Sequence, residues 1–340
     1  MKTDSKNTHR RKTQSNLNLS VVIPTLGDAA RLQDLHELAA QLRQAKSSLW
    51  CDEKRSMEII IVANLPHEEL RRRYGNDPDF IYLEVGKLGA NRARNKGLHK
   101  AQYEIVWFLD DDARLLQNDT VHRLLQAHER FPEAIGIGGR YQINESQVTR
   151  WDKIYDEIAR HWIERNRLQS PYTRQLLGGN LSLKRTQLRD EFDEVLHFGG
   201  SEAGLCARLH LSQQKLVWME DLKVGHRPRV GLLSFLRKAY LQGAGSRWLQ
   251  KNLPEARTQH WRSVLHAPPH PLYALFFRFG QWHDAYSRAP NAPPRLPWMS
   301  FAIWILRDTL AEFWRWPRRR HREVYVALKT LAHARRPAGR

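Results

Sequence analysis

Short apolar runs alternate with helical stretches along the first 140 residues, and this alternation restricts the fold more than any other feature. The runs are rich in β-branched and aromatic residues and cover residues 19–24, 57–63, 80–85, 104–109 and 135–141. Stretches with helical spacing or helix-forming charges lie between them, at 28–49, 67–74, 92–101 and 119–130. Such alternation is typical of a sheet covered by helices on both faces. The sequence therefore predicts an α/β fold.

The second half of the chain is less regular. Helices are expected over residues 151–167 and 202–211, and short strands over 215–218 and 224–227. Beyond them, clusters of proline separate further helical stretches. Domains usually hold about 100–200 residues, so a chain of 340 residues is expected to have more than one part. We expect a disordered basic tail over 1–18, an α/β domain over 19–228 and a mainly helical region over 229–340.

Neither a membrane span nor a disulfide framework is expected. The longest apolar run, residues 298–306, has nine residues, whereas a membrane span needs about 20. The first 16 residues are charged and lack an apolar core, so they are interpreted as a solvated tail and not as a secretory signal. The two cysteines, Cys51 and Cys206, fit a reducing compartment. These features predict a cytoplasmic protein.

Positive charge is concentrated toward the carboxyl terminus. The net charge is +19, of which residues 227–340 carry +16 and residues 1–226 only +3. The same stretch holds seven of the twelve tryptophans, and tryptophan prefers interfaces with one apolar and one wet side. A surface of this kind is attracted to a polyanion, either nucleic acid or an anionic membrane.

We expect the basic region to contact the inner face of a membrane peripherally, because the front of the chain is nearly neutral and carries an acidic group that repels nucleic acid. Residues 298–316 combine tryptophan with aliphatic residues and are predicted to dip into the interface, with the arginines at 318–320 contacting headgroups. The alternative is a helical bundle that packs on the α/β domain and exposes a solvated basic face.

Three consecutive carboxylates, Asp110, Asp111 and Asp112, follow directly after the apolar run 104–109. They repel one another unless positive charge lies close by, and Mg²⁺ or Mn²⁺ accepts oxygen ligands that are shared with substrate phosphates. Ligands of α/β sheets bind at the carboxyl ends of the strands. The three acids therefore predict a divalent-metal and phosphate site. The alternative is an acidic turn before the helix at 119.

The segment 87–98 is basic and contains Gly89. Glycine permits a tight turn, and the helix that follows directs its first amide groups at whatever lies before it. Arg92 and Arg94 add positive charge there, so a diphosphate is a fitting ligand. The alternative is an ordinary basic helix start without a ligand.

Seven segments, taken in order over residues 20–226, resemble the family 2 glycosyltransferases with the GT-A fold. They are VVIPTLGDAARL (21–32), IIIVAN (59–64), GANRARNKGL (89–98), IVWFLDDD (105–112), GGNLSLKR (178–185), FDEVLHFGGSEAGLCARL (192–209) and VGH (224–226). The resemblance implies a GT-A-like nucleotide-binding sheet and an inverting enzyme that takes a sugar from a nucleotide-sugar donor.

The resemblance also implies a role for each matching position. The residues that would line the nucleotide pocket or approach the donor are Pro24, Thr25, Asn64, Arg92, Arg94, Asn95, Asp110 and Asp111. Asp112 would hold the metal, and His226 would add a metal contact, unless it is only a half-buried histidine at a strand end. Many members carry an aspartate where this chain has Ala63 and Asn64, so the nucleotide stays open.

Glu202 falls where such enzymes carry the catalytic base. A carboxylate there takes the proton of the acceptor hydroxyl, which attacks the anomeric carbon from the face opposite the departing diphosphate. The alternative is a charge that stabilises a helix N-terminus. By the same resemblance Asp193, Glu194, Gly199 and Gly200 lie on the acceptor side.

These observations predict an inverting glycosyltransferase of the hexosyltransferase type that uses Mg²⁺ or Mn²⁺. The basic region favours a cell-envelope or lipid-linked saccharide as acceptor, and nucleic acid is not expected as a partner. Two other functions stay open. Charge combined with aromatic residues supports a nucleic-acid-binding protein, and a nucleotidyltransferase on a similar sheet also uses carboxylate-bound metal.

Overall fold

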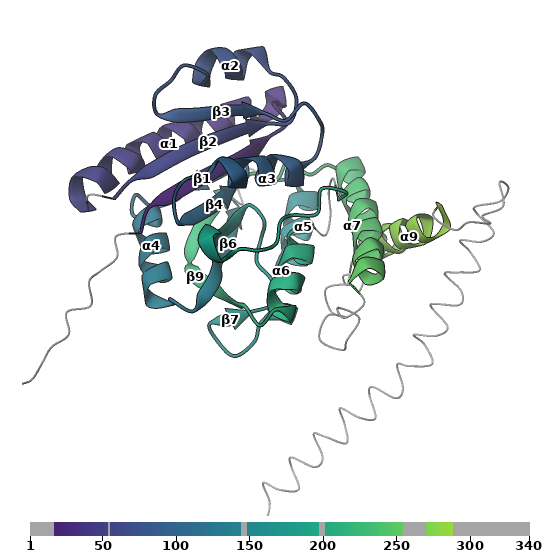
Figure 1. The fold of residues 1–340 in the computed structure, drawn as a ribbon. Coiled ribbons are helices and arrows are strands. Elements are labelled where there is room, and N and C mark those ends of the chain that lie inside the picture. Colours follow the sequence, from purple (N-terminus) through teal and green to yellow (C-terminus); the bar gives the residue numbers. More distant parts are fainter. Residues whose placement is uncertain (1–16, 54, 144–147, 197–200, 254–269, 288–340) are drawn as a thin grey trace, which may run out of the picture.

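The computed structural model describes residues 17–53, 55–143, 148–196, 201–253 and 270–287 (Figure 1). The strands are β1 (Leu19–Thr25), β2 (Met57–Ala63), β3 (Phe80–Glu84), β4 (Ile105–Leu109), β5 (Ala113–Leu115), β6 (Ala134–Ile143), β7 (Tyr172–Thr173), β8 (Asn180–Lys184) and β9 (Lys215–His226). The helices are α1 (Ala29–Glu53), α2 (Glu68–Tyr74), α3 (Ala90–Lys100), α4 (Thr120–Arg130), α5 (Arg150–Asn166), the 3₁₀ turn η2 (Arg185–Gln187), α6 (Ser201–Leu211), α7 (Leu232–Asn252) and α9 (Pro271–Ser287).

The strands of the described ranges form one mixed sheet in the order β3-β2-β1-β4-β8-β6-β9-β5, and β7 pairs with β9. Strands β3, β2, β1 and β4 are parallel, with Val22 of β1 beside Ile60 on one side and Phe108 on the other. The chain moves outward from β1 to β3 and then returns to place β4 on the opposite side of β1. The carboxyl ends of β1 and β4 flank this reversal, which is where open α/β sheets bind ligands.

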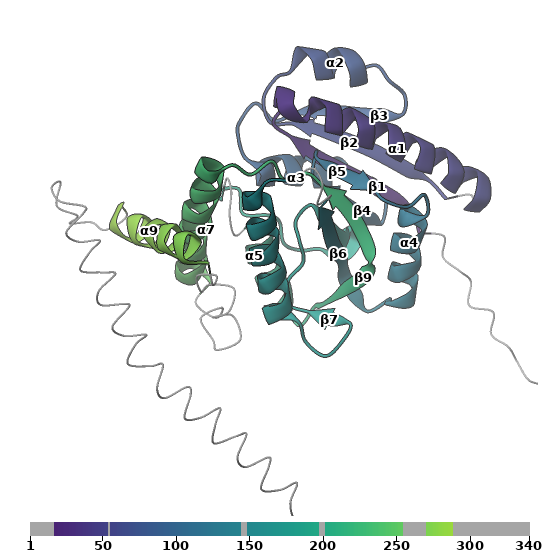
Figure 2. The ribbon, with the colours of Figure 1, turned by 180° about the vertical axis from the view of Figure 1, so that it is seen from behind.

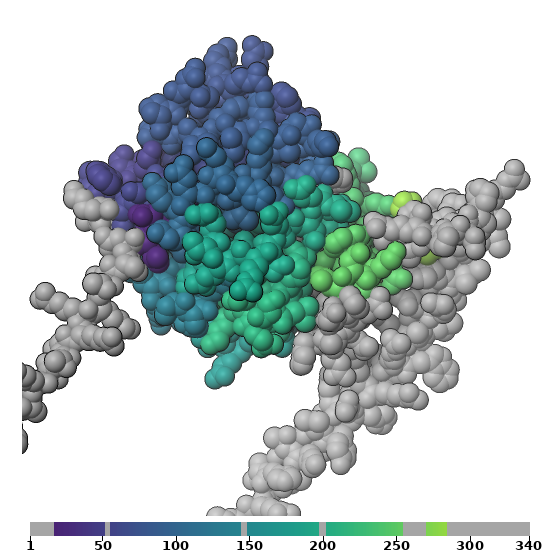
Figure 3. Space-filling model, viewed as in Figure 1, coloured from purple at the N-terminus to yellow at the C-terminus, as the bar shows by residue number. Residues whose placement is uncertain are grey.

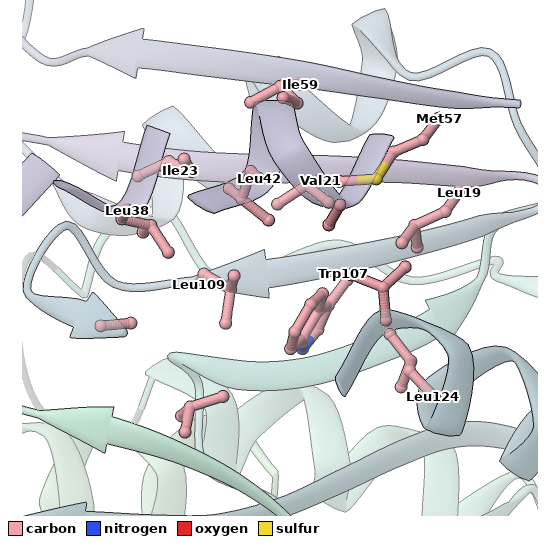
Figure 4. Close-up of a cluster of buried hydrophobic side chains, with 14 of the residues drawn as sticks. Leu19, Val21, Ile23, Leu38, Leu42, Met57, Ile59, Trp107, Leu109 and Leu124 are labelled. Carbon is pink, nitrogen blue, oxygen red and sulfur yellow. The ribbon is translucent and has the colours of Figure 1, made fainter. Parts of the chain in front are cut away.

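Helices cover both faces of the sheet, as the sequence predicts. One buried cluster joins α1 and α4 to the face with Val21, Ile59 and Trp107, and Figure 4 shows part of it. A second cluster joins α3 and α6 to the face with Val22 and Phe108. Figures 1 and 2 show α1 and α3 on opposite sides of the strands. Because neighbouring residues of a strand face opposite sides, strands buried on both faces produce continuous apolar runs.

Strands of the second half depart from the sequence prediction. β5 and β7 have three and two residues, which is too few to leave an apolar pattern. β8 lies inside the GGNLSLKR segment and pairs antiparallel with both β4 and β6. The runs predicted over 215–218 and 224–227 form one strand, β9, because the polar residues between them keep strand conformation across a register shift beside β6.

Helices α7 and α9 pack on α5 through a separate buried cluster. Phe235 and Ala239 of α7 lie with Tyr273 and Phe277 of α9 and with Ile158 of α5. Figure 3 shows α7 in contact with the preceding segments of the chain. The two helices cross closely where each carries a glycine, because a Cβ atom on Gly243 or Gly280 would lie within 2 Å of a carbonyl oxygen of the other helix.

α7 and α9 show that the described part of the region after residue 229 is mainly helical, as predicted. The division at 228/229 stays a prediction. The predicted interface segment 298–316, the arginines at 318–320 and residues 1–16 of the predicted tail lie outside the described residues. Within the described ranges, no helix is both long enough and apolar enough to span a membrane.

His128 of α4 is buried against the sheet in its neutral form. Its Nε2 atom lies 2.8 Å from Ser182 Oγ of β8. Because that hydroxyl donates its own hydrogen to the carbonyl of Ile137 at 2.7 Å, the imidazole must be the donor at Nε2. Burial, with a smaller contribution from the charge of Lys184, lowers the pKa of His128 to about 3.

We expect His128 to make the fold sensitive to mild acid. The unfolded chain binds a proton below its ordinary pKa of 6.5, whereas the folded histidine stays neutral to about pH 3. The stability it contributes is therefore complete above pH 6.5 and is lost as the pH falls, by about 1.4 kcal/mol per pH unit. The free energy of unfolding, measured with urea, should fall between pH 7.5 and pH 5 in both proteins. The fall should be about 2 kcal/mol smaller in His128→Gln than in the wild type. The exposed His99 provides the control, and equal losses in His128→Gln and His99→Gln contradict the prediction.

Candidate functional site

The three predicted carboxylates form the turn between β4 and β5, after the carboxyl end of β4 and next to β1. The N–H of Ala113 donates to the carbonyl of Asp110 at 3.0 Å, which closes the turn. Asp111 and Asp112 are buried and Asp110 is half-buried. The turn therefore brings three acids to the ligand-binding edge of the sheet and gives each of them different surroundings.

Asp111 links the ends of β1 and β4. Its Oδ2 accepts a hydrogen bond from Thr25 Oγ1 at 2.7 Å, and its Oδ1 accepts one from Arg31 Nη1 at 2.8 Å. Burial raises the pKa of Asp111, and the charge of Arg31 only partly offsets that effect. Thr25 and Asp111, both predicted to bind the donor, therefore meet directly in the fold.

Asp112 is the most buried member of the group, at 1% exposure. Its Oδ1 lies 3.3 Å from His226 Nε2, and its Oδ2 lies 3.3 Å from Arg31 Nη1. Neither oxygen accepts a hydrogen bond from the residues that the structure describes. Burial favours a raised pKa for Asp112, but the positive charges of His226 and Arg31 outweigh it and hold that pKa well below its usual value.

The short β5 strand explains how His226 reaches the acids. Ala113 pairs with His226 at the end of β9, so the histidine lies beside the residue that follows Asp112. The ring of Tyr141 stacks on His226 with ring centres 4.4 Å apart. Burial pulls the pKa of His226 down, but the carboxylate charges of Asp112 and Asp110 more than offset this and raise it.

Asp110 lies between Arg94 and Tyr141. Arg94 Nη2 is 3.1 Å from its Oδ1, and the hydroxyl of Tyr141 donates to its Oδ2 at 3.2 Å. The N–H of Gly179 donates to the same hydroxyl at 2.8 Å. A Cβ atom on Gly179 would lie only 2.1 Å from Asp110 Oδ2, so a larger residue here would displace the Asp110 carboxylate.

The residues present fit a divalent cation. One ligand atom each from Asp110, Asp112 and His226 lies within 4.8 Å of the other two. Mn²⁺ accepts carboxylate oxygens and imidazole nitrogens, and the carboxylates also suit Mg²⁺. The buried oxygens of Asp112, which accept no hydrogen bond from the described residues, have the lone pairs that such a cation requires.

Glu202, on the first turn of α6, borders the same space as Arg94. A Cβ atom on Gly178 would lie 3.3 Å from Arg94 Nη2 and 3.4 Å from Glu202 Oε2, so the two side chains flank one glycine. The negative charges of Asp110 and Glu202 add to burial in raising the pKa of the Tyr141 hydroxyl. The predicted base therefore lies beside the predicted donor site.

The other predicted donor residues support the surrounding loops. Asn64 Nδ2 donates to the carbonyl of Gly89 at 2.8 Å and fixes the turn before α3. Asn95 Nδ2 donates to the carbonyl of Phe192 at 2.9 Å, and Asn95 Oδ1 accepts from the N–H of that residue at 3.0 Å. Pro24 is buried in β1. The donor-binding role of these residues stays a prediction.

The predicted acceptor-side acids are tied to α3 and α6. Arg208 Nη1 donates to Asp193 Oδ2 at 2.8 Å, and Arg92 Nε lies 3.5 Å from Glu194 Oε2. Residues 199–200 lie outside the described residues. The role of this segment in acceptor binding stays a prediction.

Sequence reasoning missed three residues at the site: Arg31, Tyr141 and Lys238. Arg31 lies in the first turn of α1, inside the segment 21–32, where only Pro24 and Thr25 are predicted to bind the donor. Tyr141 is the last residue of the predicted strand 135–141. Lys238 comes from α7, where its Nζ atom is 4.8 Å from the ring centre of Tyr155. Burial and the nearby charge of Arg31 lower the pKa of Lys238, and Asp112 opposes them. No local motif identifies Lys238, because its position depends on the packing of α7.

Comparison with known proteins gives one family and several relatives. The profile of a family described as Glycosyl transferase family 2 matches residues 20–192. Glycosyltransferase GlyA of Streptococcus pneumoniae is 23% identical over an alignment of 210 positions that covers 57% of this chain and 29% of that protein. Glucosyl-dolichyl phosphate glucuronosyltransferase of Haloferax volcanii is 24% identical over 193 residues, 50% of this chain and 59% of that protein. The chain spans less than two thirds of either relative.

One solved structure is similar to this chain in fold. The mannosyltransferase PcManGT from Pyrobaculum calidifontis, in complex with GDP-Man and Mn²⁺, has a TM-score of 0.54 and 16% sequence identity. The match covers 94% of this chain and 88% of that protein. The similarity confirms the predicted GT-A architecture.

Proposed function

We propose that this chain, which belongs to glycosyl transferase family 2, is a metal-dependent inverting glycosyltransferase. Its donor is a nucleoside diphosphate sugar and its acceptor a saccharide hydroxyl. The family match favours this function over a nucleotidyltransferase or a nucleic-acid-binding protein.

The observation that carries the proposal is the meeting of Asp110, Asp112 and His226 at the reversal of the sheet. A divalent cation held there would neutralise charge on the departing diphosphate. Arg94, which contacts Asp110, adds a guanidinium at the same edge. Asp111 ties the end of β1 to the end of β4 through its hydrogen bond from Thr25.

Glu202 is the proposed general base. Its place beside Gly178 and Arg94 puts a carboxylate next to the donor site. An acceptor hydroxyl between Glu202 and the anomeric carbon gives its proton to the carboxylate as its oxygen attacks. The bond from the anomeric carbon to the diphosphate oxygen breaks on the opposite face, so the configuration inverts.

A donor panel tests the proposal. The full chain is incubated with GDP-mannose and with the glucose, glucuronic acid and N-acetylglucosamine derivatives of UDP, each with Mn²⁺ or Mg²⁺. GDP-mannose is included because the mannosyltransferase with this fold was solved with it. Release of a nucleoside diphosphate from at least one donor, only with metal, is the expected result. Tight nucleic-acid binding without turnover of any donor contradicts it.

The acceptor is proposed to be a cell-envelope or lipid-linked saccharide that a peripheral enzyme meets at an anionic membrane. The charge of +16 over residues 227–340 supports this. In the described part of that region, the first turns of α7 and α9 are in contact. The ring centres of Phe235 in α7 and Tyr273 in α9 are 5.0 Å apart. Four exposed leucines lie at these two helix starts: Leu232, Leu233, Leu272 and Leu275.

We expect the full chain to sediment with vesicles that contain phosphatidylglycerol and not with pure phosphatidylcholine. Most of this binding should fade between 0.1 M and 1 M salt, because the Debye length falls from about 10 Å to about 3 Å. A fraction should persist because apolar contact resists salt. A chain that ends at residue 287 should bind more weakly because it lacks much of the positive charge. Failure of the full chain to bind anionic vesicles at low salt excludes a membrane role for this region.

A further inference from the structure

Arg31 occupies an unusual place for a cation in a site that fits a metal ion. Its Nη1 atom lies 2.8 Å from Asp111 Oδ1 and 3.3 Å from Asp112 Oδ2, so one nitrogen contacts both acids. The start of α1 is fixed locally, because the N–H groups of Ala30 and Arg31 donate to Asp28 at 3.1 and 2.8 Å. The hydrogen bonds at the first turn of α1 therefore fix the backbone of Arg31 close to Asp111 and Asp112.

The positive charge of Arg31 and the charge of a metal ion compete for the same carboxylate. The predicted cation site uses Asp112, whose Oδ2 is already next to a guanidinium. A divalent ion bound there without a nucleotide would therefore be repelled by the positive charge of Arg31, because both would lie beside the Asp112 carboxylate. A nucleoside diphosphate brings negative charge to the same edge and removes that penalty.

We infer that Arg31 acts as a resident counter-cation for Asp111 and Asp112, so that the enzyme takes up the divalent metal together with the nucleoside diphosphate and binds the free metal weakly. The inference rests on the proposed function, in which both the metal and the nucleoside diphosphate bind at this edge. It assigns Arg31 a positioning role: the residue holds the two buried carboxylates in place before the donor arrives and weakens the binding of metal alone. The coupling is reciprocal, so the diphosphate must also bind more weakly without metal.

Binding of Mn²⁺ alone separates this role from a purely structural one. Free Mn²⁺ is measured by electron paramagnetic resonance while it is titrated into the wild type, Arg31→Gln, Arg31→Lys and Arg43→Gln. Arg43 is the matched control, because it also lies on α1 and forms ion pairs with two acids, Asp77 and Asp79. Thermal unfolding in chelator and in Mn²⁺ reports whether each variant is folded.

Arg31→Gln is expected to bind Mn²⁺ alone at least about tenfold more tightly than the wild type. Arg31→Lys, which keeps the charge, and Arg43→Gln should stay close to the wild type. In chelator Arg31→Gln should unfold at a lower temperature, and Mn²⁺ alone should raise that temperature more than in the wild type. The wild type should gain a comparable affinity for Mn²⁺ when GDP or UDP, tested separately, is present.

Two results overturn the inference alone: equal Mn²⁺ affinity in the wild type and Arg31→Gln, or wild-type affinity for Mn²⁺ that neither diphosphate changes. The second comparison uses only the wild type, so it holds even if the variant fails to fold. Absence of Mn²⁺ binding in every protein, with either diphosphate present, instead contradicts the metal-dependent function on which the inference rests.

Discussion

Replacing Asp112 with asparagine should lower donor turnover by at least about 10²–10³-fold, the scale seen when a group that stabilises developing charge is lost. Asp112 is buried, lies 3.3 Å from His226 and accepts no hydrogen bond from the described residues. An asparagine of the same shape keeps the packing but removes the charge that a cation needs. Excess chelator should abolish turnover by the wild type for the same reason.

The control for this variant is Asp77→Asn, which breaks a surface ion pair with Arg43 and leaves the site intact. Initial rates are measured with the donor that the panel identifies, over a range of Mn²⁺ concentrations. Circular dichroism establishes that both variants are folded. Undiminished turnover in Asp112→Asn, or in the wild type with excess chelator, rules out the metal role.

Glu202→Gln should lower kcat by about 10²–10⁴-fold while the KM for the donor changes little. The amide keeps the size of the side chain but cannot take the proton of the acceptor hydroxyl, and general-base catalysis is worth this much. Glu202 lies near Gly178, as Arg94 does, and is outside the group of Asp110, Asp112 and His226. The loss of proton removal should therefore appear in kcat, and donor binding should leave the KM for the donor almost unchanged.

The matched control is Glu191→Gln, an exposed acid before α6 that contacts His99. Transfer to acceptor is followed at saturating donor. If Glu202→Gln keeps the wild-type kcat, the base lies elsewhere. Asp193 is the next residue to test, although Arg208 holds its carboxylate at 2.8 Å.

The sequence predicts the front of the fold because its strands are buried on both faces. Val21 and Val22 of β1 belong to opposite clusters, so both had to be apolar, and the run is visible without any structure. Asp110, Asp111 and Asp112 interrupt such a run at its carboxyl end, which explains why the acid group could be located from the sequence. Long, regular and doubly buried elements are the ones that leave such a pattern.

The rest of the site depends on contacts that leave no local pattern. His226 reaches Asp112 because β5, a strand of three residues, pairs with β9. Arg31 reaches the acids from the first turn of α1, and its contact with Asp111 spans 80 positions of sequence. Lys238 arrives from α7, whose place is set by packing against α5. Family resemblance could point to His226, but it gave no reason to choose Arg31 or Lys238.

Anomalous diffraction at the manganese edge shows whether a metal ion and the nucleotide bind together at Asp112. Crystals of the full chain are grown with Mn²⁺ and the nucleoside diphosphate of the donor that the panel identifies. We expect one strong manganese peak within coordination distance of Asp112, close to Asp110 and His226, with diphosphate oxygens completing the coordination. A nucleotide bound at the ends of β1 and β4 without manganese at Asp112, or manganese bound elsewhere on the chain, contradicts the account.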